Sequence, residues 1–283
     1  MSAAGGADVL SFEASLLSAG RQAALAAAAA SLPQLLRPAA DGREPDIRIV
    51  DGTAPSWPRA LAAALDARAR GVLLTAPALA PAAEAEALAA EAESARCPVV
   101  VAMPLPYDAT IRAGIARLRK DRETLSLIDA TAMVGDDGGL PPRARLGAAF
   151  LAQLAAIRTI IGPVPALTVN LRTDRAYSAA GTGDGVTVML AGLISSLPAP
   201  VLRVDLVGPR RRHTICLAEP APATFLSYDA SGMRRPSPGY ESGLRGAWRD
   251  LHAAVTCAEP VRHGLRDLAA TLACAAPWSR WPG

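Results

Sequence analysis

The first half of the chain alternates short apolar runs with longer stretches of helical periodicity. Runs such as Gly71–Thr75 contain almost no polar side chains, which is typical of strands that are buried on both faces. The longer segments between them repeat alanine and leucine with helical spacing. We expect strands at residues 7–12, 46–51, 71–75, 98–103 and 124–129, and helices at residues 15–36, 57–70, 82–96 and 107–120. This alternation predicts right-handed crossover units on a parallel sheet.

The second half of the chain follows a different pattern. Strand-like runs are expected at residues 166–171, 201–207, 214–218 and 224–228, and helices at 143–161, 186–197, 243–257 and 261–276. This order favours an α+β domain with a mostly antiparallel sheet. Glycine- and proline-rich segments break the pattern near residues 129–142. We therefore expect one domain at 1–130 and another at 131–283, with the final helices able to return to the first.

Composition excludes several classes of protein. The 283 residues are 51% hydrophobic and 19% charged, which excludes global disorder and allows one large or two modest domains. A formal net charge of +3 does not favour a nucleic-acid partner, and Arg210-Arg211-Arg212 reads as a solvated turn. Lys120 is the only lysine, so a mechanism that needs a lysine has one candidate.

The cysteines and the apolar runs bear on the compartment. The four cysteines have no paired spacing, which indicates neither a zinc site nor a disulfide framework and favours reduced thiols. No run of 18 apolar residues predicts a membrane span, and the first residues lack the basic start of a signal peptide. We expect a cytoplasmic protein that binds neither membrane nor nucleic acid.

Four segments, in order along the chain, carry a family resemblance. Gly71–Pro77 resembles a "D-x-V-x-I-x-T-P" strand and loop, and Cys97–Leu105 stands where a "V-x-x-E-K-P" motif is found. Ile160–Val164 resembles "x-I-G-x-V", and Gly243–Trp278 resembles a closing pair of helices. Together they resemble the glucose–fructose oxidoreductase, inositol dehydrogenase and rhizopine catabolism (Gfo/Idh/MocA) family. The resemblance implies a Rossmann-like N-terminal domain, an α+β C-terminal domain with a large open sheet, and hydride transfer between a nicotinamide cofactor and a carbinol or carbonyl.

The sequence departs from that family in the dinucleotide loop. A G-x-G-x-x-G turn lets the backbone approach the pyrophosphate at a helix N-terminus, but the aligned residues here are Ser11, Glu13 and Leu16. A carboxylate at Glu13 would repel the pyrophosphate by roughly 4 kcal/mol at 4 Å separation. Alternatively, the alignment is displaced by a residue or two and Glu13 only favours the start of a helix.

The next two family positions are also changed or ambiguous. Asp51 ends the expected second strand, where the family binds the adenosine ribose, but an Asp opening the Asp51-Gly52 turn explains it equally well. Met103 stands at the catalytic lysine of the E-K-P motif. A thioether cannot polarise a carbonyl or relay a proton, so we expect Met103 to line the core or a cavity.

The family's helix with a catalytic histidine and aspartate is the third departure. Gly183–Val186 fits its opening turn, but Leu193 stands at the histidine and Ser196 at the aspartate. The histidines of the chain come later, and we expect surface or capping roles for His213, His252 and His263. A polar segment follows the expected strand at 166–171 and could line the inter-domain cleft or form a solvated loop. Its residues are Arg172, Asp174, Arg175 and Tyr177.

These departures leave two hypotheses open. In the first, the chain keeps the fold, binds no cofactor and serves as a partner or scaffold subunit for an active paralogue or pathway enzyme. In the second, it is a divergent NAD(P)-dependent oxidoreductase, or a cofactor-free enzyme, acting on a small sugar-like or carbonyl metabolite. We assign no catalytic residue and no metal site, and leave room for a small ligand between the domains. A vestigial cofactor cleft, partly filled by Phe12 or Leu16, would join Ser11, Glu13, Asp51, Ala76, Pro77 and Met103.

The expected strand at residues 201–207 has two different faces. Leu202, Val204 and Leu206 make an apolar face that suits the helices of the domain. The other face pairs Arg203 with Asp205 between valines, which suits a protein partner as well as water. We therefore expect a dimer, homomeric or with a paralogue, through this sheet.

Overall fold

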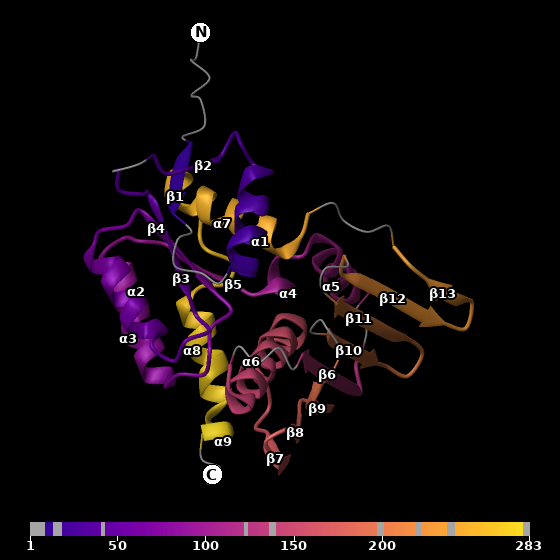
Figure 1. The fold of residues 1–283 in the computed structure, drawn as a ribbon. Coiled ribbons are helices and arrows are strands. Elements are labelled where there is room, and N and C mark those ends of the chain that lie inside the picture. Colours follow the sequence, from indigo (N-terminus) through magenta and orange to yellow (C-terminus); the bar gives the residue numbers. More distant parts are fainter. Residues whose placement is uncertain are drawn as a thin grey trace. The chain divides into compact units, whose positions relative to one another are not determined.

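The computed structural model describes residues 9–13, 19–40, 43–121, 124–135, 140–196, 201–218, 222–236 and 241–279 (Figure 1). The chain packs as two units, and each combines segments that are distant in sequence. The first unit contains Met1–Met103 and Gly243–Ala269, and the second contains Pro104–Ser242 and Ala270–Gly283. The C-terminal segment thus contributes to both units.

A parallel sheet forms the centre of the first unit. Its strands are β1 (Leu10–Glu13), β2 (Leu36–Pro38), β3 (Ile47–Asp51), β4 (Gly71–Thr75) and β5 (Val99–Ala102). Their order is β2-β1-β3-β4-β5, with every pair parallel. All five residues of β4 are buried, as the uninterrupted apolar run predicts. The expected parallel sheet is confirmed.

Helices cover this sheet in two pairs. α2 (Trp57–Asp66) packs with α3 (Ala82–Ser94), and α1 (Ala19–Ala30) packs with α7 (Gly243–Cys257). α7 also contacts β4 and β5, so a helix from the end of the chain completes the first unit. Within this unit the Phe12 ring lies 5.3 Å from the Trp248 ring, at an interplanar angle of 54°.

The expected first helix is wrong at its C-terminal end. It was predicted to continue to Leu36, but α1 ends at Ala30 and Leu36–Pro38 forms β2. Pro33 lacks an N–H group and disfavours a continuous helix, so the chain turns and extends again beside β1. The strand that ends at Asp51 is consequently the third strand of the sheet and not the second.

The second unit contains a larger sheet. Its strands are β6 (Leu127–Gly135), β7 (Thr168–Arg172), β8 (Ala176–Gly183), β9 (Val186–Ser195), β10 (Val201–Val207), β11 (Arg212–Ala218), β12 (Thr224–Asp229) and β13 (Gly232–Arg234). The order is β13-β12-β11-β10-β6-β9-β8-β7. Only β6 and β9 pair in parallel, which confirms the mostly antiparallel sheet. The remaining helices are α4 (Pro104–Tyr107), α5 (Ala109–Lys120), α6 (Pro142–Ile161), α8 (Leu265–Cys274) and α9 (Ala276–Ser279).

The expected fifth parallel strand belongs to this second sheet. β6 pairs with β9 and β10, and its residues alternate between buried and partly exposed. Such alternation is typical of a sheet that is covered on one face only, unlike the continuous apolar run of β4. The grouping of the chain thus changes at Met103 and Pro104, ahead of the expected boundary at residue 130.

The helix expected at residues 186–197 is also wrong. Val186–Ser195 is strand β9, joined to β8 by Asp184 and Gly185, whose φ angles are 52° and 76°. Two residues with positive φ are the signature of a tight hairpin turn, and an Asp-Gly pair suits it. The β-branched residues Val186, Thr187 and Val188 open β9, which pairs with β8 as far as Leu193.

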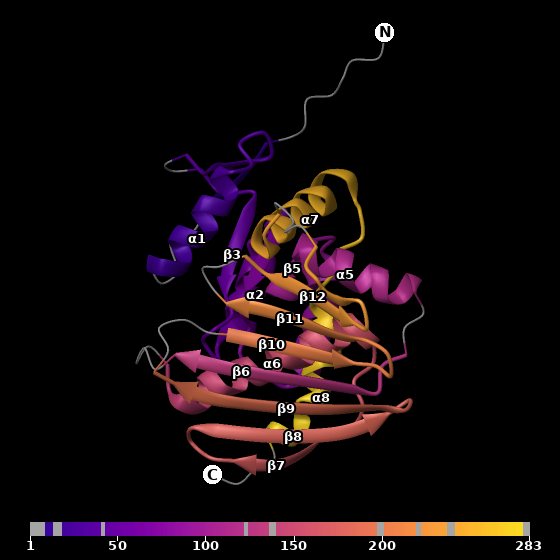
Figure 2. The ribbon, with the colours of Figure 1, turned by 90° about the vertical axis from the view of Figure 1, so that its right-hand side faces the viewer.

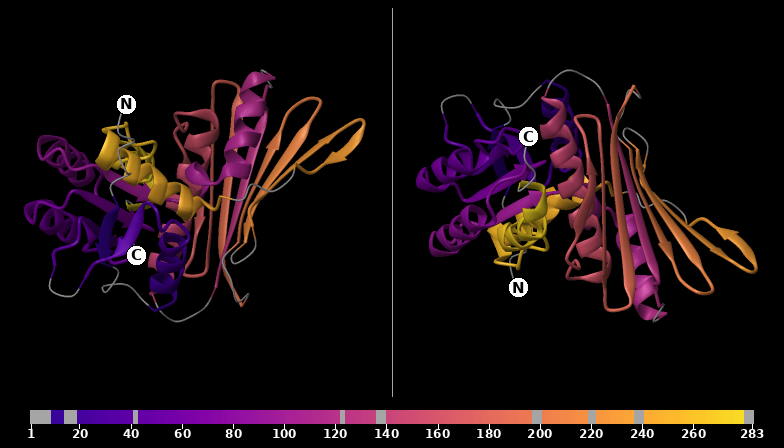
Figure 3. Two further views of the ribbon diagram at one scale, coloured as in Figure 1. Left: turned by 90° about the horizontal axis from the view of Figure 1, so that it is seen from above. Right: turned by 90° about the horizontal axis from the view of Figure 1, so that it is seen from below.

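The two faces of the second sheet differ in what covers them. α6 contacts β6 and β9, α5 contacts β12, and the cross-strand neighbours Phe225, Ile215 and Val204 are buried on this covered face. In Figure 2 the strands lie in front of α6, so that the opposite, open face is toward the viewer. Figure 3 shows the same sheet along its edge.

α6 is the only described helix that is long and apolar enough to cross a membrane. Its most apolar window has a mean hydropathy of 1.4, and 67% of that window is buried. Burial against β6 and β9 identifies α6 as a core helix of the second unit.

Candidate functional site

The carboxyl edge of the parallel sheet brings several predicted site residues to one side. Glu13 ends β1, Asp51 ends β3, and Met103 follows β5. Ala76 and Pro77 follow β4 in the same way. Parallel strands place these positions along one edge, which is where α/β sheets bind ligands. The side chain of Glu13 and the whole of Leu16 lie outside the described residues, so the cofactor cleft stays a prediction.

Ser11 is bonded to the start of β3. Its backbone N–H and its hydroxyl both donate to Asp46 Oδ2, at 2.8 and 2.7 Å, and the Asp46 N–H donates to Ser11 Oγ at 3.0 Å. Burial raises the pKa of Asp46, but the hydrogen bonds from Ser11 and the charge of Arg70 outweigh it, and the net pKa is lowered. Ser11 therefore has a structural partner in Asp46.

Asp51 forms a turn with its neighbours. Its Oδ1 accepts hydrogen bonds from the Thr53 N–H at 2.9 Å and the Thr53 hydroxyl at 2.7 Å. Gly52 donates to the Thr75 carbonyl, and a Cβ built on Gly52 would lie 2.5 Å from the Cα of Pro77. The loops after β3 and β4 are thus in backbone contact, and only glycine fits between them. The turn interpretation of Asp51 accounts for the described contacts.

Met103 and Phe12 belong to the core. Both are 6% exposed. Phe12 packs on Trp248 of α7, and thus contributes to the layer between the sheet and that helix. The thioether of Met103 provides no proton donor, and its burial agrees with the expected core position.

The polar segment after β7 supports the second unit. The Arg172 guanidinium lies 4.5 Å from the centre of the Trp278 ring and donates to the Trp278 carbonyl. Tyr177 is buried on β8, donates to Gln153 Oε1 at 2.6 Å, and its pKa is raised by burial. Asp174 forms an ion pair with Arg143 at 3.6 Å, and Arg175 lies in the three-residue β7–β8 turn. Strand β8, which contains Tyr177, was not expected from the sequence.

The segment aligned with the family's histidine helix is part of the sheet core. Leu193 and Ser196 therefore do not occupy helical positions, and this part of the alignment is corrected. Val188, Leu190 and Ile194 of β9 are buried. The three histidines are also buried, at 4% exposure for His213, 8% for His252 and 6% for His263, so the expected surface role is wrong.

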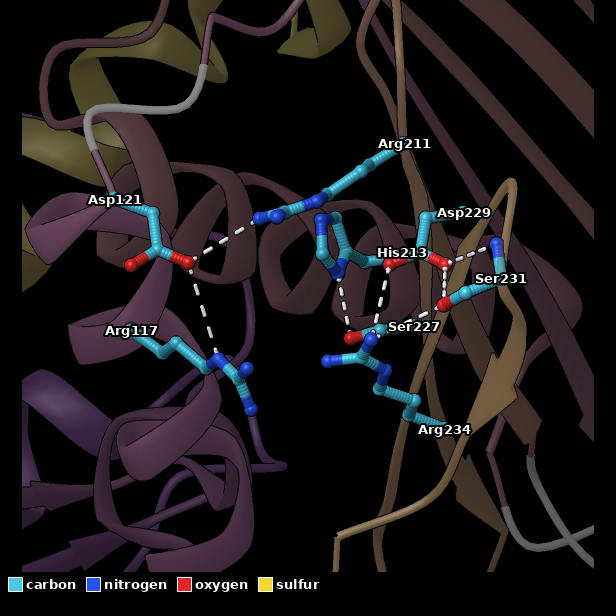
Figure 4. A network of polar contacts seen from close by, with 8 residues as sticks. All are labelled: Arg117, Asp121, Arg211, His213, Ser227, Asp229, Ser231 and Arg234. Carbon is cyan, nitrogen blue, oxygen red and sulfur yellow. Dashed lines mark hydrogen bonds and ion pairs between the residues drawn. The ribbon is translucent and has the colours of Figure 1, made fainter.

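A polar pocket that the sequence analysis missed lies between α5 and the outer strands of the second sheet (Figure 4). We call it the arginine pocket; it is a solvent-open hollow of about 350 Å³. Its floor is made by Gly114, Leu118, His213, Phe225 and Ser227, and its rim by Arg117, Asp121, Arg211, Asp229 and Arg234. These residues are separated by up to 120 positions, so only the Arg210-Arg211-Arg212 cluster was visible in the sequence.

Ion pairs link the rim of the arginine pocket. Arg211 lies 3.2 Å from Asp121 Oδ2 and Arg117 lies 3.9 Å from the same oxygen. Arg234 lies 3.8 Å from Asp229 and donates to the Ser231 hydroxyl at 3.0 Å. On the floor, His213 Nδ1 and Ser227 Oγ are 2.8 Å apart. Among the described residues, no group of three or more histidine, cysteine, aspartate or glutamate side chains is arranged to hold a metal ion.

The sequence matches no protein-family model and no curated protein sequence. Solved structures are similar to it in fold. A UDP-N-acetylglucosamine 3-dehydrogenase from Acidithiobacillus ferrooxidans has 15% identity and a TM-score of 0.71, covering 95% of this chain and 96% of that one. A 3-ketoreductase from Actinomadura kijaniata, in complex with NADP, has 15% identity and a TM-score of 0.69, with 87% and 82% coverage.

A third similar structure is an aldose-aldose oxidoreductase from Caulobacter crescentus, with 16% identity, a TM-score of 0.68, and 84% and 78% coverage. At these identities the likeness concerns the fold. The chain has the two-domain fold of the Gfo/Idh/MocA-type oxidoreductases, with a Rossmann-like parallel sheet and a large, mostly antiparallel sheet.

Proposed function

Because the chain has the Gfo/Idh/MocA fold, we propose that it is a noncatalytic protein of that fold, a partner or scaffold subunit of an active paralogue or pathway enzyme. The observation that carries this proposal is the β8–β9 hairpin. Where the resemblance implies a helix with a catalytic histidine, the chain has a strand whose Val188, Leu190 and Ile194 side chains fill the core. We assign no hydride-transfer step to it.

Two residues predicted to line the cofactor cleft make their bonds within the protein. The Ser11 hydroxyl is bonded to Asp46, and the Asp51 carboxylate accepts from its own turn. Asp51 also ends a strand on the other side of β1 from the one that would bind the ribose, since β3 and β2 flank β1 on opposite sides. A ribose-binding acid in a Rossmann fold ends the strand after the first crossover, which here is β2.

The open face of the second sheet supports a partner role. The exposed large hydrophobic side chains of the described residues are Leu171, Met189, Leu193 and Met233. Strand register places each of them on the open face. Leu171 pairs with Ser178, Met189 with Asp129 and Met233 with Tyr228, and these neighbours alternate with the buried residues of the covered face. Met189 and Leu193 of β9 and Leu171 of β7 lie within three neighbouring strands of this face, whereas Met233 lies at the far edge of the sheet. Large apolar side chains close together on one face are typical of a protein interaction surface.

A network of charged side chains also lies on the open face. Asp205 accepts hydrogen bonds from Arg203 Nε at 2.9 Å and Arg212 Nε at 3.3 Å, and also from the Thr214 hydroxyl. Burial raises the pKa of Asp205, but these donors outweigh it, so the net pKa is lowered and the carboxylate is charged at neutral pH. Apolar side chains beside this hydrogen-bonded charge network fit association with a second copy or a paralogue through this sheet.

Light scattering of the chain alone and mixed with the candidate active paralogue tests this role. We expect a dimer or a heteromer at micromolar concentration, and an oxidoreductase rate that comes entirely from the paralogue. A monomer of 29.1 kDa under both conditions would remove the partner proposal. A turnover by the isolated chain with a nicotinamide cofactor would remove the noncatalytic one.

A second candidate function is an enzyme that acts on a small sugar-like or carbonyl metabolite, either with NAD(P) or without a cofactor. The arginine pocket favours it, because it sets His213 and Ser227 at the floor of a hollow with charged side chains at its rim. All four cysteines are free, which suits a reducing compartment, and we propose a cytoplasmic location for either function.

A further inference from the structure

We propose that the arginine pocket binds the phosphoryl group of a small molecule. This ligand site is separate from the carboxyl edge of the parallel sheet, and it does not depend on the proposed partner role. All of its residues belong to the second unit.

Three guanidinium groups reach the pocket from three different elements. Arg117 comes from the last turn of α5, Arg211 from the β10–β11 turn, and Arg234 from the short strand β13 (Figure 4). Strand register places Arg234 opposite Ser227, so its side chain shares the covered face with the pocket floor. A ligand group at the mouth would thus meet positive charge from several directions.

The rim carries more positive than negative charge. Three arginines and two carboxylates, Asp121 and Asp229, form the rim, so these five side chains have a net charge of +1. The Arg117 and Arg234 contacts to these carboxylates are 3.9 and 3.8 Å, longer than the 2.7–2.9 Å of a charge-assisted hydrogen bond. Their side chains are 62% and 57% exposed, so they can turn toward an anion at the mouth without leaving a buried charge behind.

The chemistry favours a phosphoryl group over a carboxylate. A carboxylate presents one planar pair of oxygens, which a single guanidinium fork satisfies. A phosphate monoester presents three acceptor oxygens in different directions, which matches donors arriving from α5, the β10–β11 turn and β13. The pocket is open to solvent, so only the phosphoryl group of a ligand needs to lie between the three arginines.

Calorimetric titration of the full chain with inorganic phosphate and with pyrophosphate, at constant ionic strength, tests the proposal. We expect saturable binding at one site, weakened about tenfold or more in Arg117→Gln and in Arg234→Gln, as loss of a charge-assisted hydrogen bond predicts. Both side chains are more than half exposed, so both variants should fold, which their melting temperatures check.

Arg119→Gln is the matched control. Arg119 lies on the same helix and loses the same charge, but its guanidinium donates to the Thr159 carbonyl at 2.9 Å and it does not line the pocket. We expect the affinity of Arg119→Gln for phosphate and pyrophosphate to differ from that of the wild type by less than about twofold. Absence of saturable binding, equal weakening in Arg119→Gln, or acetate binding as tightly as phosphate would each overturn the phosphoryl site.

Discussion

Ser11 and Asp46 bind each other reciprocally across the start of the parallel sheet, through three hydrogen bonds of 2.7 to 3.0 Å. The pair fixes β1 beside β3 over a sequence separation of 35 residues. A glycine at position 11 would keep the backbone bond and lose the two that involve the hydroxyl. The serine hydroxyl thus stabilises the pairing of β1 with β3.

Ser11→Ala should lower the free energy of unfolding by about 1–2 kcal/mol at pH 7, because two hydrogen bonds within a charged, partly buried pair are lost. Ser56→Ala is the control, since the Ser56 side chain makes no capping hydrogen bond to α2. Urea unfolding of both variants measures the difference. An equal loss in the two variants would show that the Ser11 hydroxyl contributes nothing.

The Ser11→Ala effect should also depend on pH. The folded-state pKa of Asp46 lies below the ordinary value of 3.8, so its contribution to stability is complete above that pH and is lost as the pH falls through the folded-state pKa. Removing the Ser11 donor raises that pKa. The difference in the free energy of unfolding between the wild type and Ser11→Ala should therefore become smaller below pH 3.8.

Gly192→Ala should destabilise the second unit by about 1–3 kcal/mol, as overpacking of a core does. A Cβ at this position would lie 2.1 Å from a ring carbon of Tyr177. The ring cannot easily move, because it packs edge-on against Phe150 and Trp278 and its hydroxyl is bonded to Gln153. In a Tyr177→Leu background Gly192→Ala should lower the free energy of unfolding by less, as measured by urea unfolding. An equal loss of stability in both backgrounds would show that the Tyr177 ring is not the cause.

Cys97 should be the slowest of the four thiols to react. Burial raises its pKa to about 11, so little thiolate forms at pH 8. Cys257 is exposed and should be alkylated first. Mass spectrometry of iodoacetamide-treated protein over time gives the order. Modification of Cys97 ahead of Cys257 in the folded chain would show that this part of the first unit opens readily.

Charged substitutions on the open face should disrupt association. Met189→Glu and Leu193→Glu place carboxylates on the apolar stripe of β9, and we expect both to shift the protein to monomer in light scattering. Met233→Glu is the control, because β13 lies at the far edge of the sheet although Met233 is 62% exposed. Association that survives in Met189→Glu and Leu193→Glu would locate the interface elsewhere.

The sequence predicts the fold where its signals are local. Continuous apolar runs identify β4 and β5, and the helical periodicity of residues 143–161 identifies α6. Two local signals contradicted the initial assignment. The Asp184-Gly185 pair before a β-branched run indicates a hairpin, and the polar Asp129 and Thr131 within residues 127–135 indicate a strand that is covered on one face only.

The candidate sites depend on contacts between distant parts of the chain. The Ser11–Asp46 pair and the three guanidinium groups of the arginine pocket join residues with no periodic relationship in the sequence. The strand order β2-β1-β3-β4-β5 moves Asp51 to the other side of β1 from the strand after the first crossover. Chain order alone does not determine that placement.

We propose that this chain keeps an oxidoreductase fold without nicotinamide chemistry. Isothermal titration of the full chain with NADH and with NADPH is the decisive measurement. We expect no saturable heat at nucleotide concentrations up to about the millimolar range. Micromolar binding of either nucleotide would show that the chain has a working dinucleotide site.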